Sequence, residues 1–310
     1  MSSPRSVLLG PTASGKTAVS LPLAEAMDAE IISVDSRQIY RGMEIGSAAP
    51  TAEERGRVPH HLVGVVDPKE IMTAGDFGGR ARQAEEAVRA KSKTVLFVGG
   101  SGLYLRATLG GLDENLPSDS ELRATLRDRA RTEGTEALHA ELAELDPETG
   151  EMISVRDAQR ITRALEIIRL SGRRASELRT RGRSAEQDAR IVVLDRDRKD
   201  LEARIRARVA IMVEAGLEDE VRALLTLGLG PEQPALKSVG YVETIRYLNG
   251  DLDRDAWIEE IVVKTRRFAK RQRTWFRGLT GSEWVLVPAE ESAETTANRT
   301  LSQWGPTASS

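Results

Sequence analysis

The 310-residue chain contains no cysteine and only three histidines. Disulfide frameworks, cysteine-based zinc sites and thiol catalysis are therefore excluded, and the composition suits a reducing compartment. No apolar run approaches the roughly 20 residues that a membrane-spanning helix needs. The first strand pattern begins within a few residues of Met1, which leaves no room for a signal peptide. We expect a cytoplasmic protein that does not enter a membrane.

Neither sign of charge dominates, because the formal net charge is only -3, and aromatic residues make up 4% of the chain. This balance excludes a protein whose whole surface attracts nucleic acid, although it allows local basic patches. The length favours two domains, with enough hydrophobic residues for a proper core. Arginine greatly outnumbers lysine, which suits bidentate phosphate recognition, but a GC-rich coding bias would produce the same excess.

Short apolar runs alternate with helical patterns in much of the chain. Four runs rich in β-branched residues are too brief for helices: residues 6–9, 30–34, 94–98 and 191–194. Amphipathic helices are predicted over residues 15–27, 76–90 and 103–109. This alternation predicts an α/β fold, namely a P-loop type, doubly wound parallel sheet.

Strand patterns disappear between residues 113 and 190, where charged, arginine-rich helices are predicted over residues 119–131 and 155–170. We therefore expect a catalytic core made of residues 1–112 plus 191–287, with an all-helical insertion domain over residues 113–190. Later helices are predicted from residue 201 to Gly216, from Glu218 onward, and over residues 253–276. Residues 288–310, rich in Ala, Ser, Thr and Glu, are predicted to form a flexible tail.

A phosphate-binding loop is predicted between the first strand and the first helix. The segment Gly10-Pro-Thr-Ala-Ser-Gly-Lys-Thr17 matches the pattern G-x-x-x-x-G-K-[ST]. Its backbone N–H groups would wrap a diphosphate or triphosphate, Lys16 would neutralise outer oxygens, and the Thr17 hydroxyl would hold Mg²⁺. The predicted phosphate-binding residues are Gly10, Pro11, Thr12, Ala13, Ser14, Gly15, Lys16 and Thr17. The loop does not decide the chemistry, because kinases, ATPases and transferases share it.

Two further features narrow the chemistry. The strand over residues 94–98 runs into glycines and lacks the terminal Asp with which an ATPase holds Mg²⁺. Asp35 follows the second strand, at the sheet edge where ligands bind beside the loop. A carboxylate near bound phosphates is repulsive unless it holds the metal or removes a proton from a second substrate, and we favour the proton role. An Asp that caps the next turn and an indirect Mg²⁺ ligand are the alternatives.

Eight segments, in order along the chain, resemble the tRNA dimethylallyltransferase (tRNA isopentenyltransferase) family. Besides the loop, they are Asp35-Ser-Arg-Gln-Ile-Tyr40, Gly42-Met-Glu-Ile-Gly46, Pro59-His-His-Leu62, Ala74-Gly-Asp-Phe77, Gly99-Gly-Ser-Gly-Leu-Tyr104, Arg160-Ile-Thr-Arg-Ala-Leu-Glu166 and Ala269-Lys-Arg-Gln272 with Trp275-Phe-Arg277. The resemblance spans nearly the whole chain. It implies an enzyme that transfers the dimethylallyl group of dimethylallyl diphosphate to N6 of adenosine 37 of tRNA, next to the anticodon, with Mg²⁺ as cofactor and diphosphate as product.

The same resemblance implies roles for individual residues. The loop would hold the diphosphate of the prenyl donor instead of ATP, with Lys16 and Arg208 acting on that leaving group. Asp35 would be the catalytic base at the adenine amine. The implied tRNA contacts are Asp35, Ser36, Arg37, Gln38, Ser101, Gln159, Arg160, Ile161, Thr162 and Arg163.

Two basic regions are candidates for binding RNA. The last long helix carries Lys264, Arg266, Arg267, Lys270, Arg271, Arg273 and Arg277, interleaved with Phe268, Trp275 and Phe276. We predict a phosphate-binding face that includes Lys270 and Arg271, and we expect the aromatic rings to pack inward. In the insertion, arginines such as Arg123 could clasp the anticodon arm, but the neighbouring acidic residues are equally typical of a solvated surface.

Some features stay open. Many family members read Val-Gly-Tyr-Arg-Gln where this chain has Val239-Gly-Tyr-Val-Glu243, which puts an RNA role for that turn in doubt. We assign His60 and His61 no metal, and we expect Tyr40 and Tyr104 to pack against the sheet. A small-molecule kinase and a noncatalytic, nucleotide-gated RNA-binding protein are the alternative functions. We expect a monomer, since no additional interface pattern is present.

Overall fold

The computed structural model describes residues 4–111, 117–179 and 189–305. The chain forms two compact units, one of residues 1–109 with 186–310 and the other of residues 110–185. The sequence had placed these boundaries a few residues later, at 112/113 and 190/191. We call the first the core unit and the second the helical unit.

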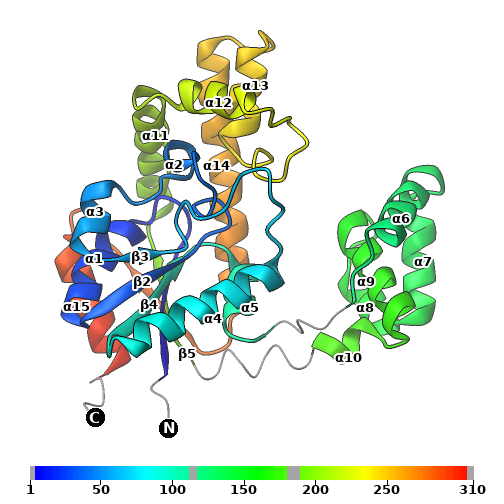
Figure 1. The fold of residues 1–310 in the computed structure, drawn as a ribbon, viewed down its shortest axis with the longest axis horizontal. Coiled ribbons are helices and arrows are strands. Elements are labelled where there is room, and N and C mark those ends of the chain that lie inside the picture. Colours follow the sequence, from blue (N-terminus) through cyan, green and yellow to red (C-terminus); the bar gives the residue numbers. More distant parts are fainter. Residues whose placement is uncertain (1–3, 112–116, 180–188, 306–310) are drawn as a thin grey trace. The chain divides into compact units, whose positions relative to one another are not determined.

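A six-stranded parallel sheet lies at the centre of the core unit (Figure 1), with strand order β3-β2-β4-β1-β5-β6. The strands are β1 (Arg5–Leu9), β2 (Ala29–Val34), β3 (His60–His61), β4 (Thr94–Gly99), β5 (Ala189–Asp195) and β6 (Ser282–Leu286). Leu8 of β1 is in register with Val98 of β4 on one side and with Val192 of β5 on the other. The predicted fold class and the four predicted strands are confirmed. The two edge strands were missed, because one is very short and the other mixes polar with apolar residues.

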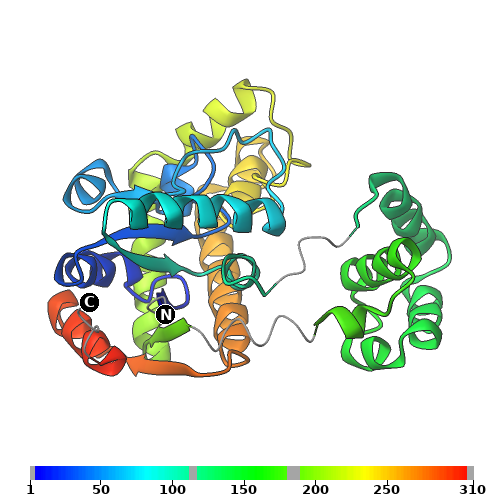
Figure 2. The same ribbon diagram turned by 60° about the horizontal axis from the view of Figure 1, so that its bottom comes forward.

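Helices cover both faces of this sheet. Those of the core unit are α1 (Lys16–Ala26), α2 (Glu44–Ser47), α3 (Ala52–Arg57), α4 (Ala74–Ala90), α5 (Gly102–Thr108), α11 (Arg198–Glu214), α12 (Leu217–Thr226), α13 (Tyr241–Leu248), α14 (Arg254–Phe276) and α15 (Ala293–Trp304). Helix α4 packs on one face, against β2 and β4, whereas α1 and α15 lie together on the other (Figure 2). All described helices fall short of the length and apolarity needed to span a membrane.

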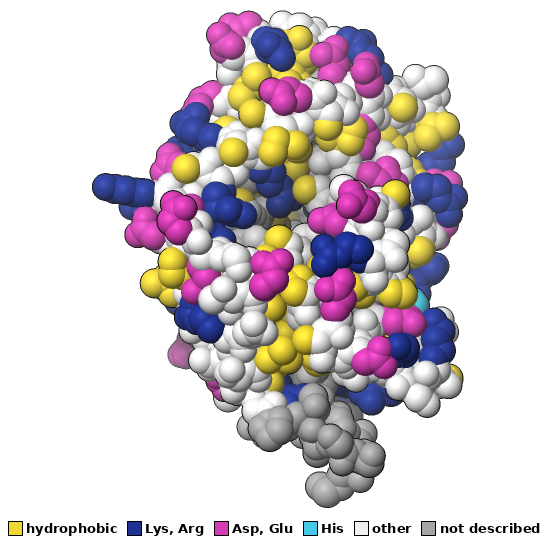
Figure 3. Space-filling model, turned by 90° about the vertical axis from the view of Figure 1, so that its left-hand side faces the viewer, with side chains coloured by type: hydrophobic (Ala, Val, Ile, Leu, Met, Phe, Trp, Pro, Cys, Tyr) yellow, Lys and Arg dark blue, Asp and Glu magenta, His cyan; other side chains and the backbone are white. Residues whose placement is uncertain are grey.

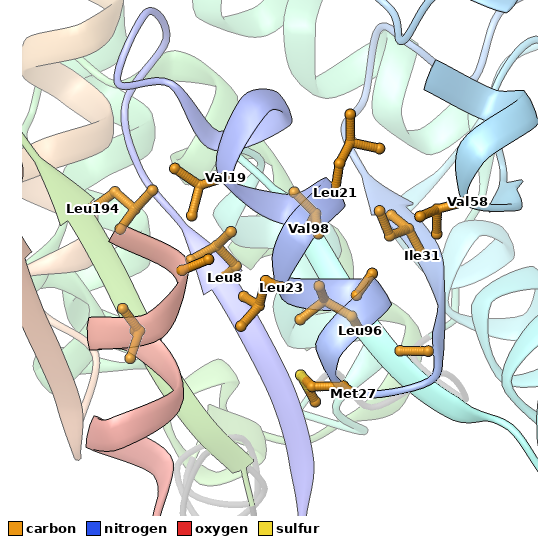
Figure 4. Packing of buried hydrophobic residues seen from close by; sticks show 14 of the residues in the cluster. Leu8, Val19, Leu21, Leu23, Met27, Ile31, Val58, Leu96, Val98 and Leu194 are labelled. Carbon is orange, nitrogen blue, oxygen red and sulfur yellow. The ribbon is translucent and has the colours of Figure 1, made fainter. Parts of the chain in front are cut away.

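Alternating strand residues form the core beneath α1 and α15. Leu8 lies beside Leu23 of α1 and Leu96 lies near Met27, while Ile31 lies beside Val58 (Figure 4). Burying each leucine or isoleucine contributes roughly 1.5–3 kcal/mol of hydrophobic stabilisation. Because β1 and α1 are both held in this core, the loop between them has fixed ends.

The predicted flexible tail is wrong for most of its length. Helix α15 begins at the N-cap Ser292 and packs against α1, with Ala297 and Trp304 in the core. Its composition resembles disorder because Thr296 and Thr300 lie on the buried face, where their hydroxyls donate to helix carbonyls. Residues 306–310 lie outside the described residues.

The helical unit contains α6 (Ser120–Thr132), α7 (Thr135–Leu145), α8 (Pro147–Met152), α9 (Ala158–Ser171) and α10 (Ala175–Arg179). Leu126, Leu138, Leu142, Ile161 and Leu165 form a separate hydrophobic core. Asp119 and Asp157 cap the starts of α6 and α9 by accepting backbone hydrogen bonds. Its described residues contain helices and no strand, as the sequence predicted.

Candidate active site

The loop over residues 10–17 connects β1 to α1 at the carboxyl edge of the sheet. Both of its glycines, Gly10 and Gly15, are required by geometry. A Cβ on Gly10 would lie 2.5 Å from the Ser14 hydroxyl oxygen and 2.7 Å from the carbonyl oxygen of Leu194. Gly15 has φ of +98°, a left-handed conformation that favours glycine. The loop therefore depends on these two positions for its tight path.

Side chains from distant parts of the chain hold the loop in place. The Nε atom of Arg196 donates to the carbonyl oxygen of Ser14 at 2.9 Å, and Nε of Arg204 donates to that of Ala13 at 2.9 Å. On the other side, the side-chain oxygen of Gln272 accepts from the Thr12 amide at 2.8 Å. Sequence reasoning missed these roles. The spacing of Arg204 and Arg208, four residues apart on one helix face, was the one available signal.

Lys16, the first residue of α1, folds back over the loop. Its Nζ donates to the carbonyl oxygens of Gly10 at 2.7 Å and Pro11 at 3.0 Å. Burial lowers the pKa of Lys16 to about 8; the nearby Asp35 carboxylate opposes this shift and Arg208 reinforces it. A bound anion would stabilise the protonated lysine and compete with the two carbonyls for it.

Asp35 directly follows β2 and lies in a network of short polar contacts. One carboxylate oxygen, Oδ1, accepts from the Arg37 amide at 2.9 Å, so the turn-capping contact that was the alternative to the proton role is present. Ser101, the N-cap residue of α5, accepts from the Ser36 amide at 3.0 Å and donates to the Ser36 hydroxyl at 3.1 Å. The other carboxylate oxygen of Asp35 has no hydrogen-bond partner within residues 4–111, 117–179 and 189–305.

A cavity of 610 Å³ brings most of the predicted donor-site residues together. The side of the cavity that the loop and the charged residues form includes Thr12, Ala13, Gly15, Lys16, Thr17, Asp35, Ser36, Arg37, Gln38, Arg204, Arg208 and Arg271. Apolar side chains from α11, α14 and the α12–α13 connection complete it, namely Val209, Ile211, Met212, Ile261, Phe268 and Val239. Gly10, Pro11, Ser14 and Ser101 do not line this cavity.

Arg208 enters the cavity from α11. One of its terminal nitrogens donates to the carbonyl oxygen of Ser47 at 3.2 Å. Burial lowers the pKa of Arg208, and the Asp35 carboxylate acts against that shift. Within the described ranges this half-buried guanidinium hydrogen-bonds only a neutral carbonyl, so it retains most of its capacity to bind an anion.

The cavity suits a magnesium ion only together with an anionic ligand. Within the part of the chain that the structure describes, no three His, Cys, Asp or Glu side chains gather as a metal site. Thr17 lines the cavity as Asp35 does. Mg²⁺ usually keeps several waters and takes its remaining ligands from phosphate oxygens and one or two protein groups. The Thr17 hydroxyl therefore fits the role that the sequence predicts for it.

The basic residues of α14 divide between two sides of the helix. Arg271 lines the cavity and stacks on Phe268, with its guanidinium carbon 5.7 Å from the ring centroid. Lys270 lines a second cavity, of 510 Å³, between α11 and α14. Three other basic residues of α14 form ion pairs. Lys264 pairs with Glu243 and Glu260, Arg266 with Glu202, and Arg273 with Asp195. Arg267, Lys270 and Arg277 have no such partner among the described residues.

The aromatic residues of α14 follow the expected inward packing only in part. Phe276 is fully buried and Trp275 is half-buried. The Trp275 ring lies under the guanidinium of Arg106 and so close to Gly102 that a Cβ there would clash with it. Phe268 is 37% exposed and faces the cavity. It is thus available to a ligand.

In the helical unit the predicted tRNA contacts have different surroundings. Ile161 belongs to the hydrophobic core and Thr162 is 3% exposed. Arg123 and Arg163 both bind Glu166, whose carboxylate is fully buried. The exposed members are Gln159 and Arg160. The side chains of Ile161 and Thr162 are therefore buried, and the tRNA contacts implied for these two residues stay predictions.

The unusual turn at residues 239–243 has a structural explanation. Glu243 is buried, caps α13 by accepting from the Gly240 amide at 2.6 Å, and forms an ion pair with Lys264 at 2.8 Å. Val239 contributes to the cavity wall. The acid therefore holds α13 to α14 and is not exposed to a ligand.

The remaining histidines and tyrosines have internal contacts. His60 lies 2.7 Å from the carbonyl oxygen of Val58, and His61 lies 2.7 Å from the carboxylate of Glu30. Tyr40 and Tyr104 are buried, and the Tyr104 hydroxyl donates to the carbonyl oxygen of Met72 at 3.0 Å. Burial of both side chains agrees with the expected packing against the sheet.

Charge distribution alone would not have located this site. On the face shown in Figure 3, acidic and basic side chains are interspersed over most of the surface. In the cavity, four basic side chains donate to backbone carbonyls, namely Lys16, Arg37, Arg204 and Arg208, whereas Lys237 is paired with Glu232.

Comparison with known proteins decides the family. The chain matches the IPP transferase family over residues 38–279 and the isopentenyl transferase family over residues 5–62. It is 43% identical to tRNA dimethylallyltransferase 1 of Trichlorobacter lovleyi, covering 93% of this chain and 94% of the relative. The chain belongs to the IPP transferase family. It is also 43% identical to the tRNA dimethylallyltransferase of Methylococcus capsulatus, over 90% of this chain and 91% of that one.

Solved structures of IPP transferases have the same fold. The full-length tRNA isopentenylpyrophosphate transferase of Bacillus halodurans superposes with a TM-score of 0.71 at 33% identity, covering 96% of this chain and 95% of that chain. A eukaryotic dimethylallyltransferase crystallised while acting on tRNA gives a TM-score of 0.74 at 25% identity, covering 93% of this chain and 74% of that chain. The resemblance read from the sequence is therefore confirmed.

Proposed function

We propose that this IPP transferase moves the dimethylallyl group of dimethylallyl diphosphate to N6 of adenosine 37 of tRNA and releases diphosphate. One observation carries the proposal: most of the phosphate-binding loop, together with Asp35 and Arg208, lines a single cavity that also has an apolar wall. The proposal is supported by relatives that are named as tRNA dimethylallyltransferases and by a solved dimethylallyltransferase acting on tRNA.

The polar end of the cavity suits the diphosphate. Loop amides and the start of α1 supply positive potential, and Lys16 and Arg208 add two charges that would stabilise the negative charge growing on the leaving group. Lys16 would exchange its bonds to the loop carbonyls for bonds to phosphate oxygens. A magnesium ion held at Thr17 would neutralise part of the diphosphate charge.

Near Asp35 the cavity suits the acceptor, the adenine base, because the Asp35 carboxylate can remove one proton from it. The N6 amine of adenine would attack C1 of the allyl group, forming the N–C bond while the C–O bond to diphosphate breaks. The proton released from N6 would pass to the unpartnered oxygen of Asp35. Adenine 37 must leave the anticodon-loop stack to reach this group, as base-modifying enzymes generally require.

The apolar wall suits a five-carbon group and excludes water. Val209, Met212 and Ile261 belong to α11 and α14, and Val239 precedes α13. Water near an allylic diphosphate would hydrolyse it, so an apolar lining that keeps water out favours transfer to the amine.

For the tRNA, we propose contacts by residues that are exposed. They are Gln159 and Arg160 of α9, together with Lys270 and Arg271 of α14. Ser36, Arg37 and Gln38 line the cavity where the flipped adenine would enter. A monomeric protein of the cytoplasm remains our proposal for its state and location.

The decisive test incubates unmodified tRNA with dimethylallyl diphosphate and Mg²⁺, followed by mass spectrometry of the nucleosides. We expect a five-carbon addition to one adenosine, mapped to position 37 by fragment analysis. Asp35→Asn should reduce the rate constant by roughly 10²–10⁴, because it keeps the turn contact to the Arg37 amide but removes the base.

Asp67→Asn is a closely matched control. Asp67 also accepts, at 2.9 Å, from the amide two residues ahead, but it does not line the cavity. This variant should transfer at the wild-type rate. Full activity of Asp35→Asn would remove Asp35 as the base, and absence of any adduct from the wild-type protein would overturn the proposed reaction.

A further inference from the structure

Arg196 is a buried arginine behind the phosphate-binding loop, and the reaction described above does not use it. It directly follows β5 and is 5% exposed. Its Nε donates to the carbonyl oxygen of Ser14 at 2.9 Å, while Nη1 donates to the Asp200 carboxylate at 2.8 Å and to the carbonyl oxygen of Pro288 at 3.3 Å. The guanidinium therefore has a fixed orientation.

A second guanidinium acts on the adjacent peptide of the loop. Arg204 donates to the carbonyl oxygen of Ala13 at 2.9 Å, and Ala13 has a φ of +65°, which is uncommon for a residue with a side chain. A Cβ on Gly15 would lie 3.5 Å from a terminal nitrogen of Arg196 and 3.5 Å from one of Arg204. The two cations thus converge on the last residue before Lys16.

This convergence has an electrostatic cost. Burial lowers the pKa of Arg204, and the neighbouring charge of Arg196 lowers it further. Asp200 is the carboxylate that bonds Arg196, whereas Arg204 lines the cavity. Two like charges are tolerated beside the loop because each has a carbonyl to bind, and because a bound anion would be attracted to both.

We propose that Arg196 is a positioning residue for the anion site: by holding the Ser14 carbonyl outward, it keeps the loop amides turned toward the diphosphate. Peptide groups are planar, so a carbonyl held on the outer side directs the following amide inward. Arg204 does the same at Ala13 and, unlike Arg196, also faces the cavity. The inference rests on the proposed function only in naming diphosphate as the ligand.

The same residue links the C-terminal segment to the loop. The carbonyl oxygen of Pro288 accepts a hydrogen bond from Arg196, and the Val287 amide donates to the carbonyl oxygen of Asp195 at 2.8 Å. The segment that was expected to be a flexible tail is therefore connected, through one guanidinium, to the phosphate-binding loop.

The test measures binding of inorganic diphosphate with Mg²⁺ by calorimetry, and binding of unmodified tRNA separately. Arg196→Met should weaken diphosphate binding about tenfold, the effect of losing one charge-assisted hydrogen bond, and leave tRNA binding unchanged. Arg196→Lys, which keeps the charge and one donor, should recover part of this loss. Asp200→Asn, which touches Arg196 but not the loop, should weaken diphosphate binding by a smaller factor.

Arg190→Met is the matched control, because Arg190 lies on β5, the strand that Arg196 follows. Its guanidinium donates to the carbonyl oxygen of Trp304 at 3.0 Å, and it does not line the cavity. It should bind diphosphate as the wild type does, even if its melting temperature falls. Wild-type diphosphate affinity in a folded Arg196→Met protein would overturn the inference, as would an equal loss in Arg190→Met. If Arg196→Met does not fold, unchanged affinity in both Arg196→Lys and Asp200→Asn would overturn it.

Because the readout is binding of diphosphate, the result does not depend on prenyl transfer. A protein that binds diphosphate through Arg196 but leaves tRNA unmodified would refute the proposed function and retain this inference. The converse result, normal transfer with Arg196 irrelevant to diphosphate, would retain the function and refute the inference.

Discussion

The arginines that line the cavity of the core unit and the arginines of the helical unit have different partners. In the core unit, Arg204 and Arg208 bond the carbonyl oxygens of Ala13 and Ser47 and line the cavity. In the helical unit, Arg123 and Arg163 converge on the buried carboxylate of Glu166. Arg129 and Arg169 likewise share Glu141.

The difference teaches that the partner, and not the abundance of arginine, decides what an arginine can do. An arginine bonded to a neutral carbonyl keeps its charge available to an anion, whereas one paired with a buried carboxylate holds helices together. Both groups look alike in the sequence, since each lies among acids on a helix. The expected consequences differ in kind, and the following substitutions test them.

The largest effect is expected at Arg208. Arg208→Met should slow prenyl transfer at saturating donor and tRNA by roughly 10²–10³, because it removes a charge that stabilises the departing diphosphate. Arg123→Met, the same change in the helical unit, should leave the single-turnover rate near the wild-type value once tRNA is saturating. Equal losses of chemical rate in the two variants would break the comparison.

The next effect is expected in the helical unit. Burial alone raises the pKa of Glu166, but hydrogen bonds from Arg123 and Arg163 outweigh burial and leave the pKa below its ordinary value. Glu166→Gln should therefore destabilise this unit by about 2–3 kcal/mol. Hydrogen exchange of residues 117–179 should accelerate while that of the core sheet does not change.

The same carboxylate makes the helical unit sensitive to acid. A lowered folded-state pKa means that the stabilisation is complete above the ordinary value of 4.5 and is lost as the pH falls from there through the folded-state pKa. In Glu166→Gln this acid dependence of exchange should be reduced. An unchanged acid response in that variant would show that other groups dominate.

A third effect concerns Lys16. Its pKa of about 8 means that the free protein loses this charge as the pH rises through 8, so diphosphate affinity should fall up to tenfold per pH unit above that value. The sign for folding is the opposite: between pH 8 and the ordinary value of 10.5, raising the pH relieves the cost of burying the ammonium.

Diphosphate itself titrates in this range, so the profile should be compared with that of Lys16→Arg at each pH. The arginine stays charged, and its affinity should decline less between pH 8 and 9.5. Parallel profiles for the two proteins would rule out Lys16 as the titrating group.

The smallest effect is expected at Lys270, an exposed cation without an ion pair among the described residues. Lys270→Gln should weaken tRNA binding about threefold and reduce the salt dependence by close to one phosphate contact. Arg131→Gln should have less effect, because Arg131 is paired with Asp128. A salt dependence unchanged in Lys270→Gln would exclude that residue from the tRNA surface.

Local patterns were enough to predict much of the fold and part of the site. The strands ending at Leu9 and Val34, and the loop and Asp35 that follow them, were predicted because a buried parallel strand and a glycine-rich loop have strong local signatures. Helix α15 was not, because its buried face uses threonine, whose hydroxyls bond the helix itself. Arg196 was missed because a buried arginine has the same local pattern as an exposed one.

The sequence by itself determined which chemical groups follow which elements along the chain. A phosphate-binding loop follows β1, an acid follows β2, and two arginines lie four residues apart on α11. Periodicity and turn residues are local, so they can be read without coordinates. Only the tertiary structure decided which arginines face an anion, which ones neutralise Glu166, and how Arg196 connects Pro288 to Ser14. Those outcomes depend on contacts between residues far apart in the chain, where a hydrogen bond of about 3 Å selects one partner among many.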